Sequence, residues 1–281
     1  MSLLTFTLSM LVLGVVAGIV GSILGLGGGI IITPIITSFF GVDIKYAIGA
    51  SIVAVIATSS GAAISYLKDD LVNVRVAMFL EIFTTIGGLL GAFLAGLFNA
   101  AVLNILFACL LIFQAYNMWR KLHQGEKVLQ NVTSDKWAEK MKLNSSYFDK
   151  QTGKEVAYQV EKVPAGASIM FGAGIASGLL GIGSGAFKVL AMDTTMKMPL
   201  KPSTATSNLM IGVTAAASAT VYFFNGYVDP SLAGPLAIGI VAGAAIGSRI
   251  MPHLPARTIR LIFIPVIGLM ALQMILKGLG L

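Results

Sequence analysis

Two glycine-rich stretches decide the fold, Leu24-Gly-Leu-Gly-Gly-Gly29 and Leu180-Gly-Ile-Gly-Ser-Gly185. Each interrupts an apolar run that is longer than one bilayer crossing requires, since a spanning helix needs about 20 apolar residues. Inside hydrocarbon every peptide group needs a hydrogen-bond partner, so a broken helix survives only where protein or a polar cavity covers the break. The two stretches therefore predict two broken helices within a membrane.

The composition agrees with a membrane location. The chain has 281 residues, of which 56% are hydrophobic and 11% are charged, whereas about a quarter of the residues of a soluble domain are charged. Nearly half of the charged residues lie between Arg120 and Lys162, which excludes a water-soluble enzyme and a disordered chain. The single cysteine and two distant histidines give no material for a metal centre. We expect no cofactor, no metal and no catalytic site.

The apolar residues form eight blocks that predict an all-α integral membrane protein. The blocks cover roughly residues 3–40, 44–66, 72–97, 100–119, 164–192, 202–224, 230–251 and 256–279. The first and fifth blocks contain the glycine stretches, so each of them is expected to form two helical legs rather than one.

The chain repeats itself. When it is aligned on itself so that Gly25 meets Gly181, the same register also pairs Gly27 with Gly183, Lys45 with Lys201, Ser51 with Ser207, Thr58 with Thr214 and Tyr66 with Tyr222. Turn glycines and lysines do not fall into one register through biased composition. We therefore predict a first transmembrane repeat over 1–122, a charged connector over 123–163 and a second transmembrane repeat over 164–281.

The distribution of Lys and Arg predicts how the repeats are oriented. If each glycine stretch turns the chain back, nearly all basic residues lie on one side, with Lys45 and Lys277 opposite and Lys188 inside the bilayer. If the stretches are mere kinks, the asymmetry is much weaker. The positive-inside rule favours the first arrangement, in which each half has an odd number of legs and the halves are inverted. The leg Gly29–Phe40 is short and is expected to be a half-helix.

The connector is expected to lie in the cytoplasm, on a protein of the cytoplasmic membrane. Residues Thr133–Met141 predict a short capped helix, and Tyr147–Val160 alternate about a glycine-containing turn as in a β-hairpin. Two interpretations stay open for it. One is a lobe that binds a cytoplasmic partner, and the other is a solvated linker on the lipid headgroups.

The glycine breaks are also the first candidates for a substrate site. Breaks at equivalent positions of two repeats indicate a site near the midplane, and a helix that starts after a break turns its free N–H groups toward that site, which favours an anion. The alternative is close helix packing through small residues, which we assign to Gly87, Gly91, Gly243 and Gly247. The candidate glycine-stretch residues are Gly27, Gly28, Gly29, Gly183, Ser184 and Gly185.

Polar residues follow the breaks at equivalent positions of the two halves. Ser51 belongs to one such cluster, and Thr206, Ser207 and Asn208 belong to the other. Hydroxyl and amide groups can donate hydrogen bonds to an oxyanion without a fixed charge. In membrane helices, however, a single serine or threonine often bonds a carbonyl of its own helix, so both interpretations stay open.

Two ionisable residues lie within apolar blocks, where charge is costly and indicates function by default. Lys188 follows Gly185 by three residues and could hold an anion. Glu81 is an isolated carboxylate and is our candidate for proton coupling. The alternatives are that Lys188 pairs with Asp193 or reaches the interface, and that Glu81 pairs with Arg75 or Lys188.

These motifs resemble the TauE/SafE sulfite exporter family, also called TSUP. The resemblance rests on the duplicated L-G-x-G-x-G stretches, on Pro34, and on Lys201-x-x-x-Ala-Thr-Ser207 followed by Ile211-Gly-Val-Thr-Ala-Ala-Ala, and it covers both membrane halves but not the connector. The second repeat departs from the pattern at Ser184 and Leu190. The resemblance implies a secondary transporter of sulfite, sulfonates such as sulfoacetate, or other small organic anions. It implies binding positions at 27–29, 183–185 and 206–208.

The function expected from the sequence is alternating-access transport of a small organosulfur anion. An uncoupled anion channel is the first alternative, and a membrane scaffold whose connector binds a partner is another. An intramembrane enzyme is not expected, because the apolar blocks contain no nucleophile with a base and no metal cluster. The expected partners are the anion and membrane lipids, with a homodimer left open and nucleic acid excluded.

Overall fold

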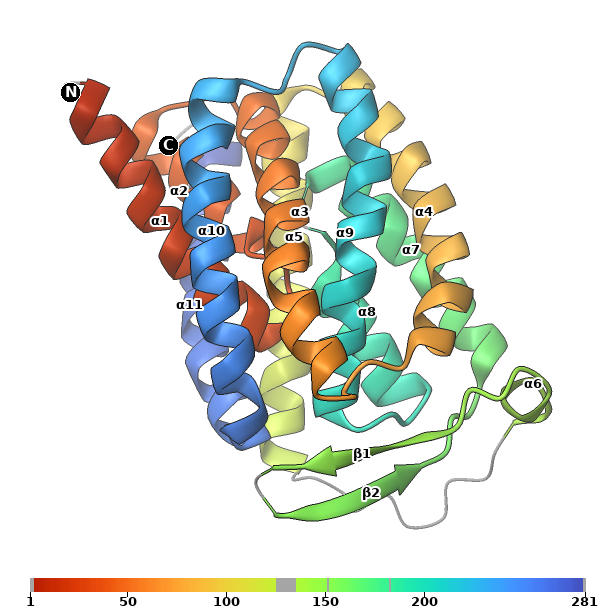
Figure 1. Ribbon diagram of the computed structural model, residues 1–281. Helices are drawn as coiled ribbons and strands as arrows, with labels where there is room; N and C mark the ends of the chain where they lie inside the picture. Colours follow the sequence, from red (N-terminus) through yellow and green to blue (C-terminus); the bar gives the residue numbers. More distant parts are fainter. Residues whose placement is uncertain (1–2, 125–134, 151, 182, 280–281) are drawn as a thin grey trace.

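The first glycine stretch separates helix α1 (Leu3–Leu24) from helix α2 (Gly29–Phe40) in the computed structural model, which describes residues 3–124, 135–150, 152–181 and 183–279. Gly25 has a φ of 71°, and the N–H of Leu26 donates to the carbonyl of Gly21 over 2.9 Å. This is the Schellman ending, which closes a helix with a left-handed glycine. The chain then turns, and α2 returns toward the end of the bundle where α1 began (Figure 1). The predicted break and short leg are confirmed.

The second glycine stretch acts in the same way on the second half. Helix α7 (Val163–Leu180) ends at Gly181, which has a φ of 65°, and helix α8 (Gly185–Leu190) follows. A π-helical turn, Ala191–Thr195, continues α8. The chain enters this half from the opposite end of the bundle, so α7 and α1 start at opposite ends (Figure 1).

Three further long helices complete each half. The first half adds α3 (Ile44–Lys68), α4 (Val74–Leu97) and α5 (Ala100–Gln124), and the second adds α9 (Leu200–Phe224), α10 (Pro230–Ile250) and α11 (Ala256–Gly278). A one-turn 3-10 helix, Met251–His253, follows α10. Within the described residues, six helices are long and apolar enough to cross a membrane, namely α1, α3, α4, α7, α9 and α10.

Helices from opposite halves pack in matching pairs. Helix α1 packs along α10 and α7 packs along α4, while α3 lies against α9 and α5 against α11. Glycines permit the close approach, because a Cβ on Gly91 would strike the carbonyl of Ile175, and one on Gly243 would strike the carbonyl of Val15. The packing interpretation of these glycines is confirmed. The matching pairs are consistent with inverted halves, which remain a prediction.

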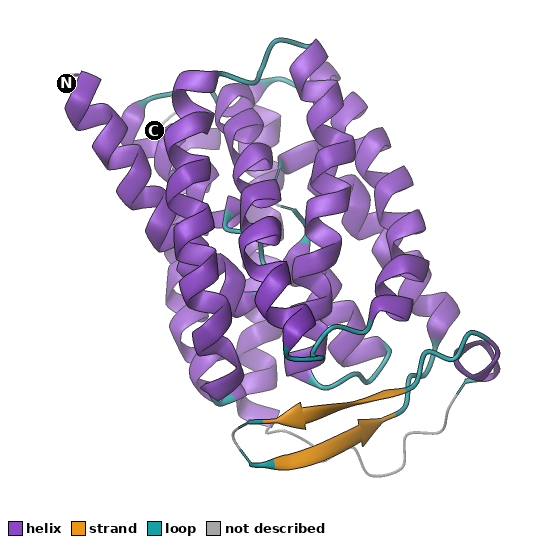
Figure 2. Cartoon of the chain, viewed as in Figure 1, coloured by secondary structure: helices purple, strands orange, loops and turns teal. Residues whose placement is uncertain are grey.

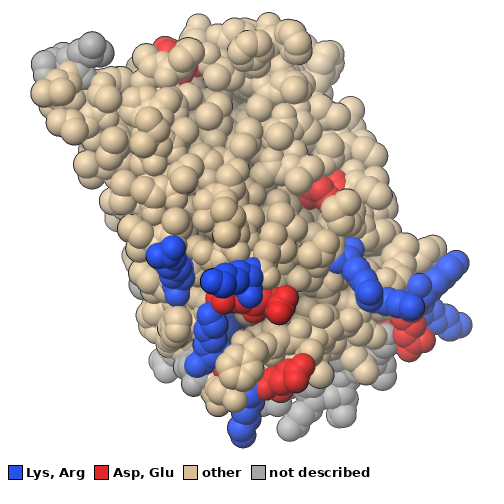
Figure 3. Space-filling model, in the orientation of Figure 1, with Lys and Arg blue, Asp and Glu red and all other residues tan. Residues whose placement is uncertain are grey.

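Basic side chains gather at one end of the bundle. Figure 3 shows Lys and Arg on this face around the end that carries the β-hairpin, with a broad, mostly uncharged surface beyond it on which no Lys or Arg is seen. At the other end, Lys45 Nζ lies 5.4 Å from the ring centroid of Tyr227, and Lys277 Nζ contacts the carbonyl of Thr37. The structure therefore separates the basic residues as the Lys and Arg pattern predicts for a chain that turns back at its glycines.

The described part of the connector is a folded lobe on the basic end of the bundle. It consists of α6 (Lys136–Lys140) and an antiparallel hairpin of β1 (Ser145–Asp149) and β2 (Lys154–Tyr158) (Figure 2). Asp135 caps α6 by accepting from the N–H of Trp137, as predicted, while positions 133–134 of the predicted helix lie outside the described residues. The described residues of the connector therefore form a helix and a β-hairpin, as the sequence predicts.

Side chains on the membrane helices hold the lobe. Lys201 Nζ, at the start of α9, lies 2.5 Å from Asp149 Oδ1, and Asn73 Nδ2, before α4, donates to the carbonyl of Leu143 over 2.7 Å. Asn73 also donates to the hydroxyl of Tyr158, and burial raises the pKa of that hydroxyl. These buried contacts show that the lobe packs on the starts of α4 and α9.

Candidate functional site

The two glycine stretches meet midway along the bundle. A Cβ on Gly185 would strike the carbonyl of Gly25, and one on Gly29 would come within 2.8 Å of the carbonyl of Gly181. Figure 2 shows loop segments at this depth, surrounded by helices. The structure therefore brings the breaks of both halves into direct contact, so that six of the predicted site residues lie in one place.

Val55 and Ile211 fill the space around the turns. A Cβ on Gly27 would lie 2.8 Å from Ile211 Cδ1 and 3.0 Å from Val55 Cγ1, and a Cβ on Gly183 would lie 2.8 Å from Val55 Cγ1. Val55 and Ile211 occupy equivalent positions in the middle of α3 and α9. Both glycines also have positive φ, at 76° and 69°. Only glycine therefore fits at either position without strain.

Two serines tie the turns to the opposite halves. The hydroxyl of Ser51 donates to the carbonyl of Gly181 over 2.8 Å, and that of Ser207 donates to the carbonyl of Gly25 over 2.9 Å. Ser207 also lies within 3.1 Å of the carbonyl of Gly185. Carbonyls that the broken helices leave without helical partners are thus satisfied by side chains.

The other two residues of the α9 cluster have different surroundings. Asn208 Nδ2 donates to the carbonyl of Ser22 over 2.9 Å, next to the first turn, whereas its Oδ1 is buried with no partner among the described residues. Thr206 Oγ1 instead accepts from the N–H of Asn73. The structure therefore brings Ser207 and Asn208 to the glycine turns and places Thr206 at the start of α4.

The start of each short helix lacks a side-chain cap. Gly28 precedes α2, and Ser184, with a φ of 48°, precedes α8 without capping it. Within the described residues, the fully buried hydroxyl of Ser184 has no hydrogen-bond partner. A buried hydroxyl without a partner is costly, and it marks a place where a polar ligand would be stabilised.

Lys188 and Glu81 form a buried ion pair. Lys188 Nζ lies 3.4 Å from Glu81 Oε2, and the two residues are 0% and 7% exposed. Of the alternatives that the sequence left open, the pairing of Glu81 with Lys188 is the one present. The pair connects α8 of the second half with α4 of the first, close to the glycine turns.

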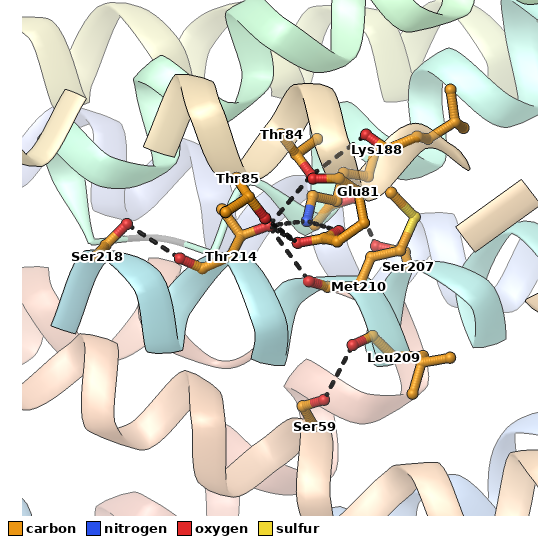
Figure 4. A network of polar contacts seen from close by, with 12 residues as sticks. Ser59, Glu81, Thr84, Thr85, Lys188, Ser207, Leu209, Met210, Thr214 and Ser218 are labelled. Carbon is orange, nitrogen blue, oxygen red and sulfur yellow. Dashed lines mark hydrogen bonds and ion pairs between the residues drawn. The ribbon is translucent and has the colours of Figure 1, made fainter. Parts of the chain in front are cut away.

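Threonines complete this network (Figure 4). Lys188 Nζ donates to Thr214 Oγ1 over 2.6 Å, and the Thr214 hydroxyl donates to Glu81 Oε1 over 2.5 Å. Thr85 also donates to Glu81, and Thr84 Oγ1 lies 3.3 Å from Thr214 Oγ1. The site residues predicted from the sequence do not include these threonines. The sequence did contain one signal for Thr214, because the repeat register pairs it with Thr58. In the structure Thr58 also lies at a glycine turn, where its hydroxyl donates to the Gly27 carbonyl over 3.0 Å.

An apolar cavity lies apart from the glycine turns. It has a volume of about 430 Å³, lies between α5 and α11 and is lined by residues such as Tyr116 and Leu272. Among the described residues, no group of three or more His, Cys, Asp or Glu side chains could hold a metal ion. The apolar lining of this cavity offers little to a charged ligand, unlike the polar groups at the glycine turns and at the Glu81–Lys188 pair.

Comparisons with known proteins agree on one class. The model of the family described as sulfite exporter TauE/SafE matches residues 10–274. The chain is 28% identical to the probable membrane transporter protein YunE of Bacillus subtilis, over 96% of this chain and 97% of that protein. It is 26% identical to a probable membrane transporter protein of Methanocaldococcus jannaschii, over 95% and 94%. No solved structure matches the chain.

Proposed function

The chain belongs to the TauE/SafE sulfite exporter family, and on that premise we propose that it moves sulfite or an organosulfonate such as sulfoacetate across the cytoplasmic membrane by alternating access. Membership in this family makes it a multi-pass membrane transporter. The substrate, the mechanism and the cytoplasmic location of the connector are the proposed parts.

The contact between the glycine turns of the two halves carries the proposal. A site formed between two repeats is exposed to either side when the repeats move against each other, which is the geometry that alternating access requires. In this proposal Gly27, Gly28 and Gly29 line the site from the first half, and Gly183, Ser184 and Gly185 line it from the second; the contacts between the two turns support it. The halves therefore share the site.

The donors at this point suit an oxyanion. Sulfite and sulfonate groups carry three oxygens that accept hydrogen bonds, and the unpartnered Ser184 hydroxyl can donate one. Gly28 gives the first N–H groups of α2 no side-chain cap, and the start of a helix favours negative charge. Lys188, three residues beyond Gly185, supplies positive charge. Ser51, Ser207 and Asn208 hold the turns in place, and Thr206 connects α9 to α4.

Thermal unfolding of the purified protein tests the site. The ligands are sulfite, thiosulfate, sulfoacetate, taurine, acetate and a divalent metal, because a ligand that binds the folded state raises the melting temperature by mass action. We expect sulfite or a sulfonate to raise it and Ser184→Ala to reduce that shift. Ser168→Ala is the matched control, since Ser168 is an exposed serine on α7 that bonds its own helix.

The outcomes separate the alternatives. A shift by the metal alone would contradict the anion site. Counterflow in proteoliposomes separates a transporter from an uncoupled channel, because only a carrier exchanges labelled external anion for unlabelled internal anion. We expect counterflow of ³⁵S-sulfite, and a flux that does not saturate and shows no counterflow would point to a channel.

A further inference from the structure

The ammonium group of Lys188 has one N–H donor without an acceptor among the described residues. It has three N–H donors, and in the described residues it contacts two acceptors, Glu81 Oε2 at 3.4 Å and Thr214 Oγ1 at 2.6 Å. The longer of these distances is the one to the carboxylate. Gly185 belongs to the second glycine turn, and Lys188 follows it by three residues in α8. Lys188 is therefore our candidate counter-charge for an anion bound at the turns.

We propose that Glu81 is the proton site of this transporter, and that one proton and one anion bind together because both act on Lys188. The inference rests on the proposed function and names its coupling ion. In the structure, the carboxylate of Glu81 is the counter-charge of Lys188. When a proton from solution binds Glu81, the carboxylate becomes neutral, and the incoming anion takes its place as the counter-charge.

The charge of the buried site explains why the two events are linked. The pair Glu81–Lys188 is neutral overall, and so is protonated Glu81 with an anion on Lys188. Either ligand alone leaves an uncompensated charge in a region where both side chains are almost fully buried, which is expensive. The proton and the monoanion therefore bind and leave together.

The neighbouring helices contribute no competing charge at this level. Helix α7, which packs on α4, contains no ionisable residue between Val163 and Leu180. In α9 the ionisable residues are Lys201, which pairs with Asp149 at the basic end, and Tyr222, which donates to the carbonyl of Gly178. On α4 itself the other charged residue is Arg75, which is exposed and bonds the carbonyl of Lys142.

Another neighbour is the π-helical turn that follows α8. It carries Asp193, which is half-buried and lies five residues beyond Lys188. Asp193 takes part in interactions of its own. Among the described residues, Lys188 forms its ion pair with Glu81, so protonation of Glu81 changes the charge next to Lys188.

Proteoliposomes containing the whole chain test the inference. The probes are ³⁵S-sulfite and isethionate, a sulfonate that stays fully ionised, so protons that move with it cannot travel as the neutral acid. A carrier with one proton per monoanion accumulates the anion about tenfold for each pH unit of an imposed gradient. We expect acid outside to drive accumulation of isethionate, an internal pH indicator to report acidification, and a potassium diffusion potential to have no effect.

The variant Glu81→Gln keeps the shape of the side chain but cannot exchange a proton. We expect anion flux through this variant to stop responding to a pH gradient, because its side chain carries no exchangeable proton. The control Glu155→Gln removes an exposed carboxylate of the hairpin and should accumulate the anion like the wild type.

The measurements distinguish failure of the proton site from failure of the proposed function. Accumulation by Glu81→Gln equal to that of the wild type would overturn the proton site, and so would wild-type flux that follows voltage instead of the pH gradient. If Glu81→Gln fails to fold, the wild-type measurements of internal pH and voltage decide the inference alone. Absence of wild-type counterflow with both probes would instead overturn the proposed function.

Discussion

Ser51 and Ser207 make reciprocal hydrogen bonds between the halves of the protein. Each is the repeat equivalent of the other, and each donates to the carbonyl of the first turn glycine in the opposite half, Gly181 at 2.8 Å and Gly25 at 2.9 Å. A substitution at either position leaves a buried carbonyl without its donor. The two serines therefore connect the halves at the point where the turns meet.

Ser51→Ala and Ser207→Ala are expected to destabilise the protein by similar amounts. Loss of the donor for a buried carbonyl costs about 1–3 kcal/mol, and we expect both variants to lower the melting temperature in detergent. Ser60→Ala is the control, because Ser60 is exposed and bonds the carbonyl of Ile56 in its own helix. If all three variants have the same melting temperature as the wild type, the reciprocal hydrogen bonds contribute nothing to stability.

Gly183→Ala is expected to damage both stability and transport. The left-handed backbone costs an L-residue about 1–2 kcal/mol, and the new Cβ would lie 2.8 Å from Val55 Cγ1. Adding Val55→Ala should recover the part of the loss that comes from the contact. Gly172→Ala provides the comparison, since a Cβ at Gly172 meets nothing within 4 Å. Thermal melts and counterflow rates measure the series, and equal behaviour of the two alanine variants would contradict the assigned roles.

A double-mutant cycle measures the ion pair between Glu81 and Lys188. Removal of one partner leaves a buried charge, so Glu81→Gln and Lys188→Met are each expected to lower the free energy of unfolding by about 3–5 kcal/mol. The double variant leaves no charge and should lose much less than the sum. Additive losses would show that the two side chains, 3.4 Å apart in the structure, do not interact energetically.

The stability of the hairpin is expected to depend on Asp149 and not on Lys150. Asp149 pairs with Lys201 at 2.5 Å in a buried contact, whereas Lys150 pairs with Asp69 at the surface. Exposed ion pairs contribute about 0–1 kcal/mol. We therefore expect Asp149→Asn to speed hydrogen exchange of the amides in Ser145–Tyr158, and Lys150→Gln to leave it unchanged. The reverse order would mean that the surface pair holds the lobe.

Much of the fold follows from local patterns in the chain. The glycines that end α1 and α7, the short leg Gly29–Phe40 and the hairpin of the connector were all predictable, because helix breaks and turns depend on residues that are neighbours in sequence. The contacts of the lobe were not predictable, since the pairing of Asp149 with Lys201 depends on how the hairpin packs on α9.

The candidate site was predictable in part. The repeat register identified both glycine turns and the serines that bond them, because duplication places equivalent residues at equivalent points of the fold. The sequence also grouped Thr206 with Ser207 and Asn208, because they are consecutive polar residues in an apolar block, although adjacent residues of a helix point in different directions. Thr206 accordingly bonds the start of α4 while its two neighbours reach the first glycine turn.

The sequence by itself determined that this is a membrane protein with a glycine break in each half, and it predicted that the halves are repeats, because apolar length, glycine position and repeat register are all read along the chain. Only the tertiary structure decided which polar groups meet inside it. Glu81 and Lys188 are 107 residues apart, and α4 of one half must pack beside α8 and α9 of the other before they can pair. Because no water solvates a charge inside the bundle, each buried charge pairs with the group that helix packing places beside it.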